Sequence, residues 1–139
     1  MILVIVGSHP QGFERLINEV DRLAKRKIIC DVFMQIGCSE YIPKYVSYKR
    51  YLGYKELHEL IRKCDFVISH AGAGITMEVL EAKKKLILVP RYKRFFEHSN
   101  NHQLDITNAL EKEKAVLSVY NIKDLEGAIK RLNEFSPMV

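Results

Sequence analysis

Short apolar runs alternate with amphipathic helical patterns along most of this chain, and this alternation limits the folds that it can adopt. The first run, residues 2–6, contains only isoleucine, leucine and valine and is followed by Gly7. An unbroken apolar run of this length is typical of a strand that is buried on both faces. Residues 13–27 come next, and their apolar side chains recur at helical spacing from Leu16 to Leu23. The chain therefore begins with a predicted strand and a predicted helix.

The rest of the chain repeats this rhythm, although the third strand alternates weakly and is expected at an edge of the sheet. The predicted strands are residues 2–6, 28–35, 45–52, 66–68, 86–89 and 115–119, and the predicted helices are residues 13–27, 55–63, 76–82, 101–111 and 122–135. Parallel strands need crossover connections, which are usually helices. Six strands separated mostly by helices therefore predict an α/β fold with a Rossmann-like, doubly wound and mostly parallel sheet. No linker or change in composition divides the chain, so residues 1–139 are predicted to form a single domain.

The composition agrees with a globular protein that binds an anion. Of the 139 residues 47% are hydrophobic, and 22 basic against 17 acidic residues give a net charge of +5. This surplus suits an anionic ligand, a nucleic acid or an acidic membrane surface without choosing among them. The basic residues are dispersed among acidic ones and no RNA-binding motif is present, so a nucleic acid is not an expected partner.

The cysteines and the first residues predict the cellular setting. Cys30, Cys38 and Cys64 are odd in number and form no C-x-x-C pair, which favours reduced thiols in a cytoplasmic protein. The apolar run that follows Met1 is too short for a signal peptide or a membrane span. Any contact with a membrane is therefore expected to come from a surface patch or from a partner protein.

A glycine-rich segment, S-H-A-G-A-G-I-T at residues 69–76, links a predicted strand to a predicted helix. In a doubly wound sheet the ligand site lies at the carboxyl ends of the strands, where this segment would be. Gly72 and Gly74 would let the backbone approach a ligand closely, and free N–H groups at the helix start would attract a phosphate. Thr76 can donate a hydrogen bond, and Glu78, expected in the first helical turn, can accept from ribose hydroxyls.

This segment matches neither common nucleotide fingerprint. A Rossmann G-x-G-x-x-G pattern would need glycine where Met77 stands, and a P-loop would need Gly-Lys-Ser/Thr, which is absent. A simple glycine-rich turn that connects strand to helix is the alternative interpretation.

Gly7, Ser8 and His9 follow the first predicted strand and would reach the same edge of the sheet. A glycine there allows close approach of a diphosphate or a sugar. His9 can accept a proton as a general base or donate a hydrogen bond, and it is the candidate catalytic residue. The alternative is a loop histidine with neither role.

The segment at residues 90–103 follows the fifth predicted strand and is rich in side chains that suit a sugar nucleotide. Arg91, Lys93 and Arg94 would meet phosphate charge. The amide and imidazole groups suited to sugar hydroxyls belong to Asn101, His102 and Gln103.

Neither a metal nor another cofactor is expected. His98 and His102 are spaced i, i+4, but no third ligand is evident. The chain also has no Asp-x-Asp pair, which metal-dependent sugar transferases generally use to hold a divalent ion on the diphosphate. Helix N-termini and basic side chains would neutralise the diphosphate instead.

Four segments together resemble the C-terminal domain of glycosyltransferase family 28, and the likeness covers almost the whole chain. They are V-G-S-H at residues 6–9, M-Q-I-G at 34–37, S-H-A-G-A-G at 69–74 with Glu78, and P-R-Y-K-R-F-F-E-H-S-N-N-H-Q at 90–103. Within that family the chain is most similar to the small bacterial exopolysaccharide and capsule transferase subunits. It is more distantly similar to the cytosolic catalytic subunit of the eukaryotic transferase that adds the second GlcNAc to dolichol diphosphate.

The resemblance implies the donor-binding half of a GT-B fold. Such a subunit would be cytoplasmic, and a membrane-anchored partner subunit would bind a lipid-linked saccharide acceptor and hold the pair at the membrane. The implied reaction is an inverting, metal-independent transfer of a hexose or N-acetylhexosamine from a UDP-sugar. The motifs and the resemblance together give the expected donor-binding residues, which are Gly7, Ser8, Ser69, His70, Gly72, Ala73, Gly74, Ile75, Thr76, Glu78, Arg91, Asn101, His102 and Gln103.

The resemblance also assigns parts of the donor to particular residues. Residues 72–75 would line the uridine and the diphosphate, Glu78 would hold the ribose, and His102 and Gln103 would face the sugar. The general base would be His9 or a residue of the partner. A non-catalytic nucleotide-binding or activating subunit of another transferase is the alternative function. Without its partner, such a subunit could form a homodimer through the apolar face meant for that partner.

Overall fold

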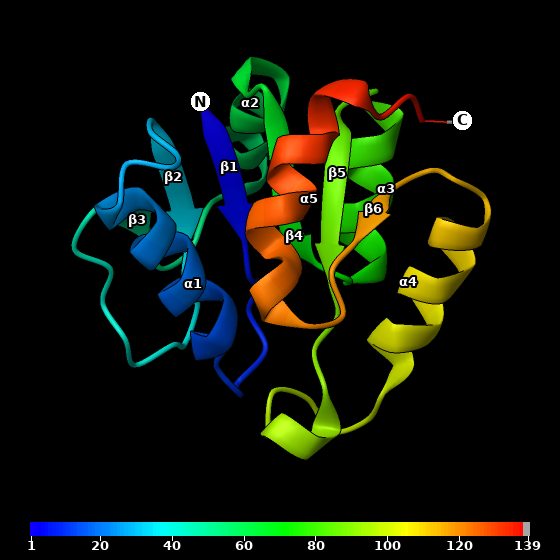
Figure 1. Cartoon of the computed structure of the whole chain (residues 1–139). Coiled ribbons are helices and arrows are strands. Elements are labelled where there is room, and N and C mark those ends of the chain that lie inside the picture. The colour runs from blue at the N-terminus through cyan, green and yellow to red at the C-terminus, as the bar shows by residue number, and fades with distance from the viewer. Residues whose placement is uncertain (138–139) are drawn as a thin grey trace.

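A six-stranded sheet lies between two layers of helices in the computed structural model, which describes residues 1–137 (Figure 1). The strands are β1 (Ile2–Ile5), β2 (Val32–Gln35), β3 (Ser47–Lys49), β4 (Phe66–His70), β5 (Lys85–Val89) and β6 (Leu117–Ser118). Their order is β3-β2-β1-β4-β5-β6, and every neighbouring pair is parallel. The predicted Rossmann-like, doubly wound α/β fold is therefore confirmed. The last two residues of the domain predicted over residues 1–139 lie outside the described part of the chain.

Helices cover both faces of this sheet. Over residues 1–137 they are α1 (Glu14–Lys25), α2 (Tyr54–Lys63), α3 (Ala73–Glu81), α4 (His102–Lys112), α5 (Leu125–Arg131) and the short 3-10 helices η1 (Lys93–Phe95), η2 (Ile122–Asp124) and η3 (Leu132–Glu134). Helices α1 and α5 pack on one face, and α2, α3 and α4 pack on the other. Figure 1 shows α1 and α5 in front of the sheet and α2 and α3 behind it. Within the same residues no helix is both long and apolar enough to cross a bilayer.

The two helical layers explain why the apolar run at residues 2–6 is unbroken. Successive side chains of a strand point to opposite faces of the sheet. Ile2 and Val4 accordingly lie in the core beneath α1 and α5, and Leu3 and Ile5 lie in the core beneath α2 and α3. Helices cover both faces of this central strand, so neither face has room for a polar side chain.

The connections of the sheet change direction between β1 and β4. From β1 the chain leads outward to β2 and β3, and from β4 it leads the other way to β5 and β6. The crevice at such a switch point, outside the carboxyl ends of the strands, is the usual ligand site of an open parallel sheet. The segments that follow β1 and β4 therefore meet where a functional site is expected.

Most predicted elements agree with the structure within two residues, but two predicted strands do not. The strand predicted at residues 28–35 begins only at Val32, because the chain turns at Lys27 and Asp31, whose φ angles are 60° and 55°. The strand predicted at residues 45–52 shortens to β3, whose residues are exposed. It pairs with β2 alone and lies at an edge, as predicted.

Two predicted helices also differ from the structure. The helix predicted at residues 76–82 begins three residues earlier, at Ala73, with Gly72 as its N-cap and Gly74 in its first turn. Glycine hides helical periodicity because it has no side chain to mark an apolar face. The helix predicted at residues 122–135 is divided, with a 3-10 turn at each end of α5.

Candidate functional site

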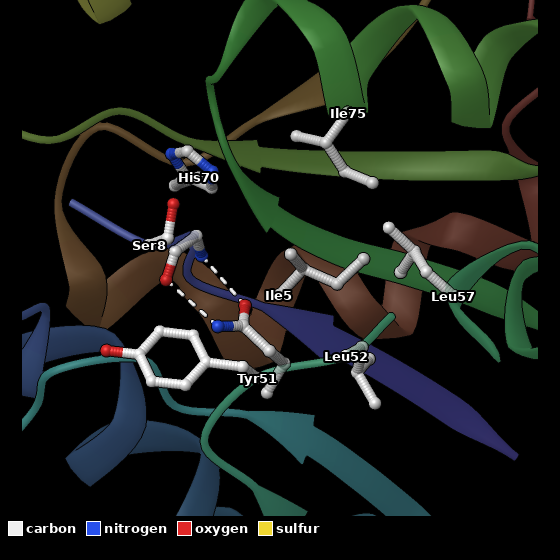
Figure 2. A pocket seen from close by; sticks show the side chains of 9 residues that line it. Ile5, Ser8, Tyr51, Leu52, Leu57, His70 and Ile75 are labelled. Atoms are coloured by element: carbon white, nitrogen blue, oxygen red, sulfur yellow. Dashed lines mark hydrogen bonds between the residues drawn. The ribbon is translucent and has the colours of Figure 1, made fainter. Parts of the chain in front are cut away.

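A shallow pocket lies at the switch point, where the carboxyl ends of β1, β2 and β4 meet. Its volume is about 190 Å³. It is lined by Ile5, Gly7, Ser8, Gln35, Tyr51, Leu52, Leu57, His70 and Ile75 (Figure 2). Pockets for drug-sized ligands usually measure about 300–1,000 Å³, so this one can hold a part of a nucleotide sugar rather than the whole molecule.

The pocket has two chemically different sides. Figure 2 shows the side chains of Ile5, Leu52, Leu57 and Ile75 on one side, and Ser8 and His70 on the other. The apolar side is built from β1, α2, α3 and the loop after β3. An apolar wall beside convergent hydrogen-bonding groups is the usual design of a small-molecule site.

Gln35, the last residue of β2, holds the loop that follows β1. Its Oε1 accepts a hydrogen bond from Gly7 N–H at 2.9 Å, and its Nε2 donates to the carbonyl oxygens of Gly7 at 2.9 Å and Arg50 at 2.8 Å. The two bonds to Gly7 are drawn in Figure 2. Gly7 has a φ of 84°, which favours glycine, and a Cβ there would lie 2.5 Å from His70 Nε2. Ser8 is exposed beside it at the rim of the pocket.

The glycine-rich segment brings the N-terminus of α3 to the pocket. The N–H of Thr76 donates to Gly72 O at 3.0 Å, which is the first i to i−4 hydrogen bond of the helix. The N–H groups of residues 73–75 precede it and point out of the first turn, where they can bind an anion. A Cβ at residue 72 would lie 2.6 Å from Cε1 of His70, whereas no atom of residues 1–137 lies within 4 Å of one at Gly74.

Two hydroxyl groups that were expected at the site point into the protein. The Thr76 side chain is 1% exposed, and its Oγ1 has no hydrogen-bond partner among the described residues. Ser69 is fully buried and donates to the carbonyl oxygen of His70 at 2.8 Å. Because α3 begins at Ala73, Thr76 falls on the buried side of the helix, and neither hydroxyl lines the pocket.

Gln103 determines which nitrogen of His70 carries the proton. Its Oε1 accepts from the N–H groups of Ala71 at 3.0 Å and Arg91 at 3.1 Å. The Nε2 of Gln103 therefore faces His70 Nδ1, 3.0 Å away, as the donor. Because Nδ1 must accept, the neutral ring carries its proton on Nε2. Nε2 lies beside Gly7, since it is the atom closest to where a Cβ on Gly7 would be.

Burial keeps His70 neutral. Desolvation lowers the pKa of its imidazole to about 3, and the positive charge of Arg91 acts in the same direction. At neutral pH His70 is therefore a hydrogen-bond donor rather than a cation or a proton carrier. Gln103, which was expected to face a sugar, is 6% exposed with both ends of its amide bonded, and it acts on the pocket through His70.

Arg91 does not line the pocket, although the sequence suggested that it meets phosphate charge. Its side chain is 1% exposed, and the guanidinium donates to the carbonyl oxygens of Gln11 at 2.7 Å, Glu97 at 2.8 Å and Val6. Desolvation lowers its pKa to about 10, which leaves it charged at neutral pH. In this structure Arg91 joins the loop after β1 to the loop after β5.

The remaining residues of that second loop have different roles. The Oδ1 of Asn101 accepts a hydrogen bond from Lys93 N–H at 3.0 Å, so this side chain supports the loop. His102 begins α4 with an exposed imidazole and does not line the pocket. His98 and His102 lack a third metal ligand: within residues 1–137 no group of three histidine, cysteine or acidic side chains is placed to hold a metal ion.

His9 lies in the loop after β1 with one of its ring nitrogens hydrogen-bonded to the backbone. Its Nδ1 accepts a hydrogen bond from Gln11 N–H at 3.1 Å, and its ring stacks on that of His98 with centroids 4.3 Å apart. Burial lowers the pKa of His9, and the charge of Arg91 lowers it further. While this bond is made, the neutral ring carries its proton on Nε2.

Glu78 lies in the second turn of α3 rather than the first, because the helix begins at Ala73. One oxygen of its carboxylate lies 3.6 Å from Nε2 of His58 on α2. Glu78 is not part of the pocket lining, but it follows Ile75 by three residues, and residues at this spacing share a helix face. Its carboxylate therefore stands one turn beyond the pocket wall.

Several pocket residues were not predicted from the sequence, and Tyr51 is the most informative of them. Residues 45–52 were interpreted as one strand, but β3 ends at Lys49, so the residues that follow belong to the edge where the site lies. Tyr51 is 53% exposed, with its hydroxyl 2.9 Å from Cys38 Sγ. Gln35 had a visible signal, since it is a polar residue at the end of an apolar run.

Comparison with known proteins gives the family and two informative relatives. The glycosyltransferase family 28 C-terminal domain model matches residues 1–138. UDP-N-acetylglucosamine transferase subunit ALG13 of Homo sapiens is 36% identical over 116 residues, which cover 80% of this chain and 9% of that protein. The UDP-N-acetylglucosamine--N-acetylmuramyl-(pentapeptide) pyrophosphoryl-undecaprenol N-acetylglucosamine transferase of Prochlorococcus marinus (strain MIT 9515) is 35% identical over 125 residues, 84% of this chain and 30% of that protein. The chain thus spans less than a third of the length of either relative.

Solved structures share the fold at lower sequence identity. The NMR solution structure of ALG13 matches with a TM-score of 0.68 at 18% identity, covering 99% of this chain and 88% of that chain. UDP-GlcNAc 2-epimerase from Neisseria meningitidis, bound to UDP-GlcNAc, matches with a TM-score of 0.66 at 13% identity, covering 96% of this chain and 36% of that chain. These likenesses show the fold alone. Because the family model extends over almost every residue, the chain belongs to the glycosyltransferase family 28 C-terminal domain family.

Proposed function

We propose that this chain binds a UDP-sugar and supplies the donor half of an inverting, metal-independent glycosyltransferase. The observation that carries the proposal is the pocket at the switch point, where an apolar wall, the N-terminus of α3 and the Nε2–H of His70 converge. UDP-N-acetylglucosamine is the first candidate donor, because the names of the two relatives above specify UDP-N-acetylglucosamine.

Each part of the donor has a matching feature. The uracil would lie against the apolar wall near Tyr51, where a planar base can bury its faces. The diphosphate would meet the N–H groups of residues 73–75 and the Nε2–H of His70. The ribose would extend along α3 from Ile75 toward Glu78, whose carboxylate can accept from two hydroxyls. His102 would remain free for the sugar.

The chain would act mainly by stabilising the leaving group. An acceptor hydroxyl attacks the anomeric carbon as the bond from that carbon to the diphosphate oxygen breaks. Negative charge then builds up on UDP, where the positive end of α3 and a fixed N–H donor lower its energy without rearranging. Since the Nδ1 of His9 is occupied, we assign the base that takes the acceptor's proton to the partner.

The acceptor would come from a second protein. The pocket is too small for a whole UDP-sugar, and the name of the human relative describes that protein as a subunit. We propose a membrane-anchored partner subunit that binds a lipid-linked saccharide and closes over the carboxyl edge of the sheet. This arrangement would hold the chain at the cytoplasmic face of the membrane.

Calorimetry with two tyrosine variants tests the proposed nucleotide site. Tyr51→Ala should weaken UDP binding about tenfold or more, since stacking of an aromatic side chain on a base contributes about 1–3 kcal/mol. Tyr54→Ala is the matched control, because Tyr54 is 74% exposed and does not line the pocket. UDP should bind more tightly than GDP to the unmodified chain. Equal losses in the two variants, or no binding of UDP, would contradict the proposed site.

A further inference from the structure

Two phenylalanines stand in solvent at the end of the molecule that carries the pocket. We call residues 93–96, with the sequence Lys-Arg-Phe-Phe, the aromatic tip. Phe96 is 80% exposed, the largest fraction among the large apolar side chains of residues 1–137, and Phe95 is 46% exposed. Figure 1 shows this segment after β5, in yellow-green, extending beyond the carboxyl ends of the strands. Two adjacent exposed rings form an apolar patch, which is more informative than a single exposed apolar residue.

Hydrogen bonds and an ion pair of the flanking residues hold the aromatic tip in place. Arg91, just before it, binds the carbonyl oxygen of Glu97, just after it, at 2.8 Å. The carboxylate of Glu97 pairs with Arg15 on α1 at 2.9 Å and also accepts from Tyr92 N–H at 3.1 Å. Asn101 fixes Lys93 N–H from the other side at 3.0 Å. The two rings are therefore displayed by an ordered turn and are not a frayed end.

The backbone of the turn directs Phe96 outward. Phe96 adopts a φ of 57° and a ψ of 31°, a left-handed conformation that is uncommon for a bulky side chain. Its N–H closes the turn by donating to Lys93 O at 3.0 Å. Residues held in sparsely populated conformations often belong to functional segments.

The charge beside the two rings is positive. Lys93 and Arg94 are exposed, and no ion pair joins either of them to an acidic side chain among residues 1–137. The guanidinium of Arg94 lies over the Tyr92 and Phe95 rings, 4.8 and 4.7 Å from their centroids. Glu97, the only acidic residue within the adjoining loop, is already paired with Arg15. The tip is thus apolar at its end and cationic at its base.

We propose that the aromatic tip inserts into the headgroup region of an anionic membrane. Phenylalanine rings at the boundary of the acyl chains, with lysine and arginine among lipid phosphates, are the usual chemistry of interfacial anchoring. A lipid interface can deform around a protruding tip, whereas a protein partner would need a groove already shaped to receive it. This contact does not depend on the proposed function, but it would turn the pocket edge toward lipid-bound acceptors.

A single tryptophan reports directly on the insertion. The chain has no tryptophan, so Phe96→Trp introduces one fluorophore at the tip. Its emission should shift to the blue and be quenched by bromine-labelled acyl chains in vesicles of phosphatidylcholine with phosphatidylglycerol. Tyr45→Trp, at an exposed position just before β3, should show neither change. An unshifted emission at position 96 would overturn the proposal.

Flotation with the same vesicles separates the apolar and the charged contributions. Phe95→Ser with Phe96→Ser should lower vesicle binding at least about tenfold. Lys93→Gln with Arg94→Gln should lower it about 30-fold, because each cation near an anionic surface contributes about a factor of five. The control pair Lys63→Gln with Lys112→Gln lies at the carboxyl ends of α2 and α4, away from the tip, and should have a much smaller effect.

Three outcomes would contradict the membrane contact. They are equal binding to vesicles of pure phosphatidylcholine, equal losses in the tip and control pairs, and vesicle binding that requires an added partner subunit. The last outcome would place the tip against a protein. UDP binding by the Phe95→Ser with Phe96→Ser variant should be unchanged, so that a failure of the membrane contact is distinct from a failure of the nucleotide site.

Discussion

At the scale of single residues, the site depends on a histidine that is kept from titrating. Gln103 occupies Nδ1 of His70 while burial lowers the pKa of the ring to about 3. The Nε2–H that faces the pocket is then a donor at every physiological pH. A permanent donor can stabilise charge on a leaving group without first having to acquire a proton.

The same histidine should make the fold sensitive to acid. The pKa of His70 in the folded chain, about 3, lies below the ordinary histidine value of 6.5, so the unfolded chain takes up the proton first as pH falls. Stability that is fully present above pH 6.5 should therefore be lost progressively below it, by about 1.4 kcal/mol at about pH 5.5. Urea unfolding, measured above pH 6.5 and at about pH 5.5, should show a smaller loss of unfolding free energy in His70→Asn than in the unmodified chain. The exposed His102→Asn variant should keep the full loss, and identical behaviour of the two variants would refute this role.

Arg91 gives a second prediction at this scale, because its bonds are structural. Arg91→Lys cannot reach the carbonyl oxygens of Val6, Gln11 and Glu97 together. We expect the free energy of unfolding to fall by about 2–4 kcal/mol, through unsatisfied buried groups. Chemical denaturation measures this loss. If Arg91→Lys instead leaves the stability unchanged and weakens only UDP binding, Arg91 contacts the phosphate as the sequence suggested.

At the scale of elements, the beginning of α3 combines a weak helix start with an open approach. Gly72 offers no capping side chain, and Gly74 leaves the first turn bare. A glycine inside a helix lowers its stability, so a residue that serves only the fold would be better replaced by alanine. The open surface instead suits a phosphate that must come close to the backbone.

Two glycine variants separate these effects. The added methyl group of Gly74→Ala would have no atom of residues 1–137 within 4 Å, so this variant should stabilise the fold by about 0.5–1 kcal/mol. The same methyl group should lower UDP affinity. Gly127→Ala, inside α5 and away from the pocket, should give a comparable gain without any change in affinity. Thermal unfolding and calorimetry on both variants provide the measurements. A Gly74→Ala protein with normal affinity would argue against a phosphate at the start of α3.

At the scale of the whole molecule, the parallel sheet brings separate loops to one edge. The last residues of β2 and β4 and the segments after β1, β3 and β4 contribute to the pocket, and the segment after β5 carries the aromatic tip. One end of the molecule would thus bind the nucleotide, meet the partner and touch the membrane.

The whole-molecule arrangement also predicts how binding responds to metal. UDP should raise the melting temperature, because a ligand of the folded state stabilises it by mass action. The charge on the diphosphate would be met by helix N–H groups and His70, so the shift should be the same with a chelator as with magnesium. A thermal-shift series compares the two. A shift that requires magnesium would contradict metal-independent binding.

The fold was largely predictable, whereas the roles within the site were not. Central strands such as β1 are buried on both faces, so their apolar runs are visible in the sequence. The edge strand β3 and the glycine-bearing start of α3 lack such a pattern, so β3 is shorter than predicted and α3 begins earlier than predicted. Gly7 and His70 were expected at the site and do line the pocket, but Arg91 and Ser69 were expected there as well and are buried.

The sequence by itself determined the α/β class, the parallel sheet and the edge of the sheet that carries the glycine-rich segments, because periodicity and glycine placement are local properties. Only the tertiary structure decided that Gln103 acts through His70, that Arg91 joins two loops and that Tyr51 belongs to the pocket. The direction of a side chain and its hydrogen-bond partners depend on segments far apart in the chain. No local pattern of residues specifies them.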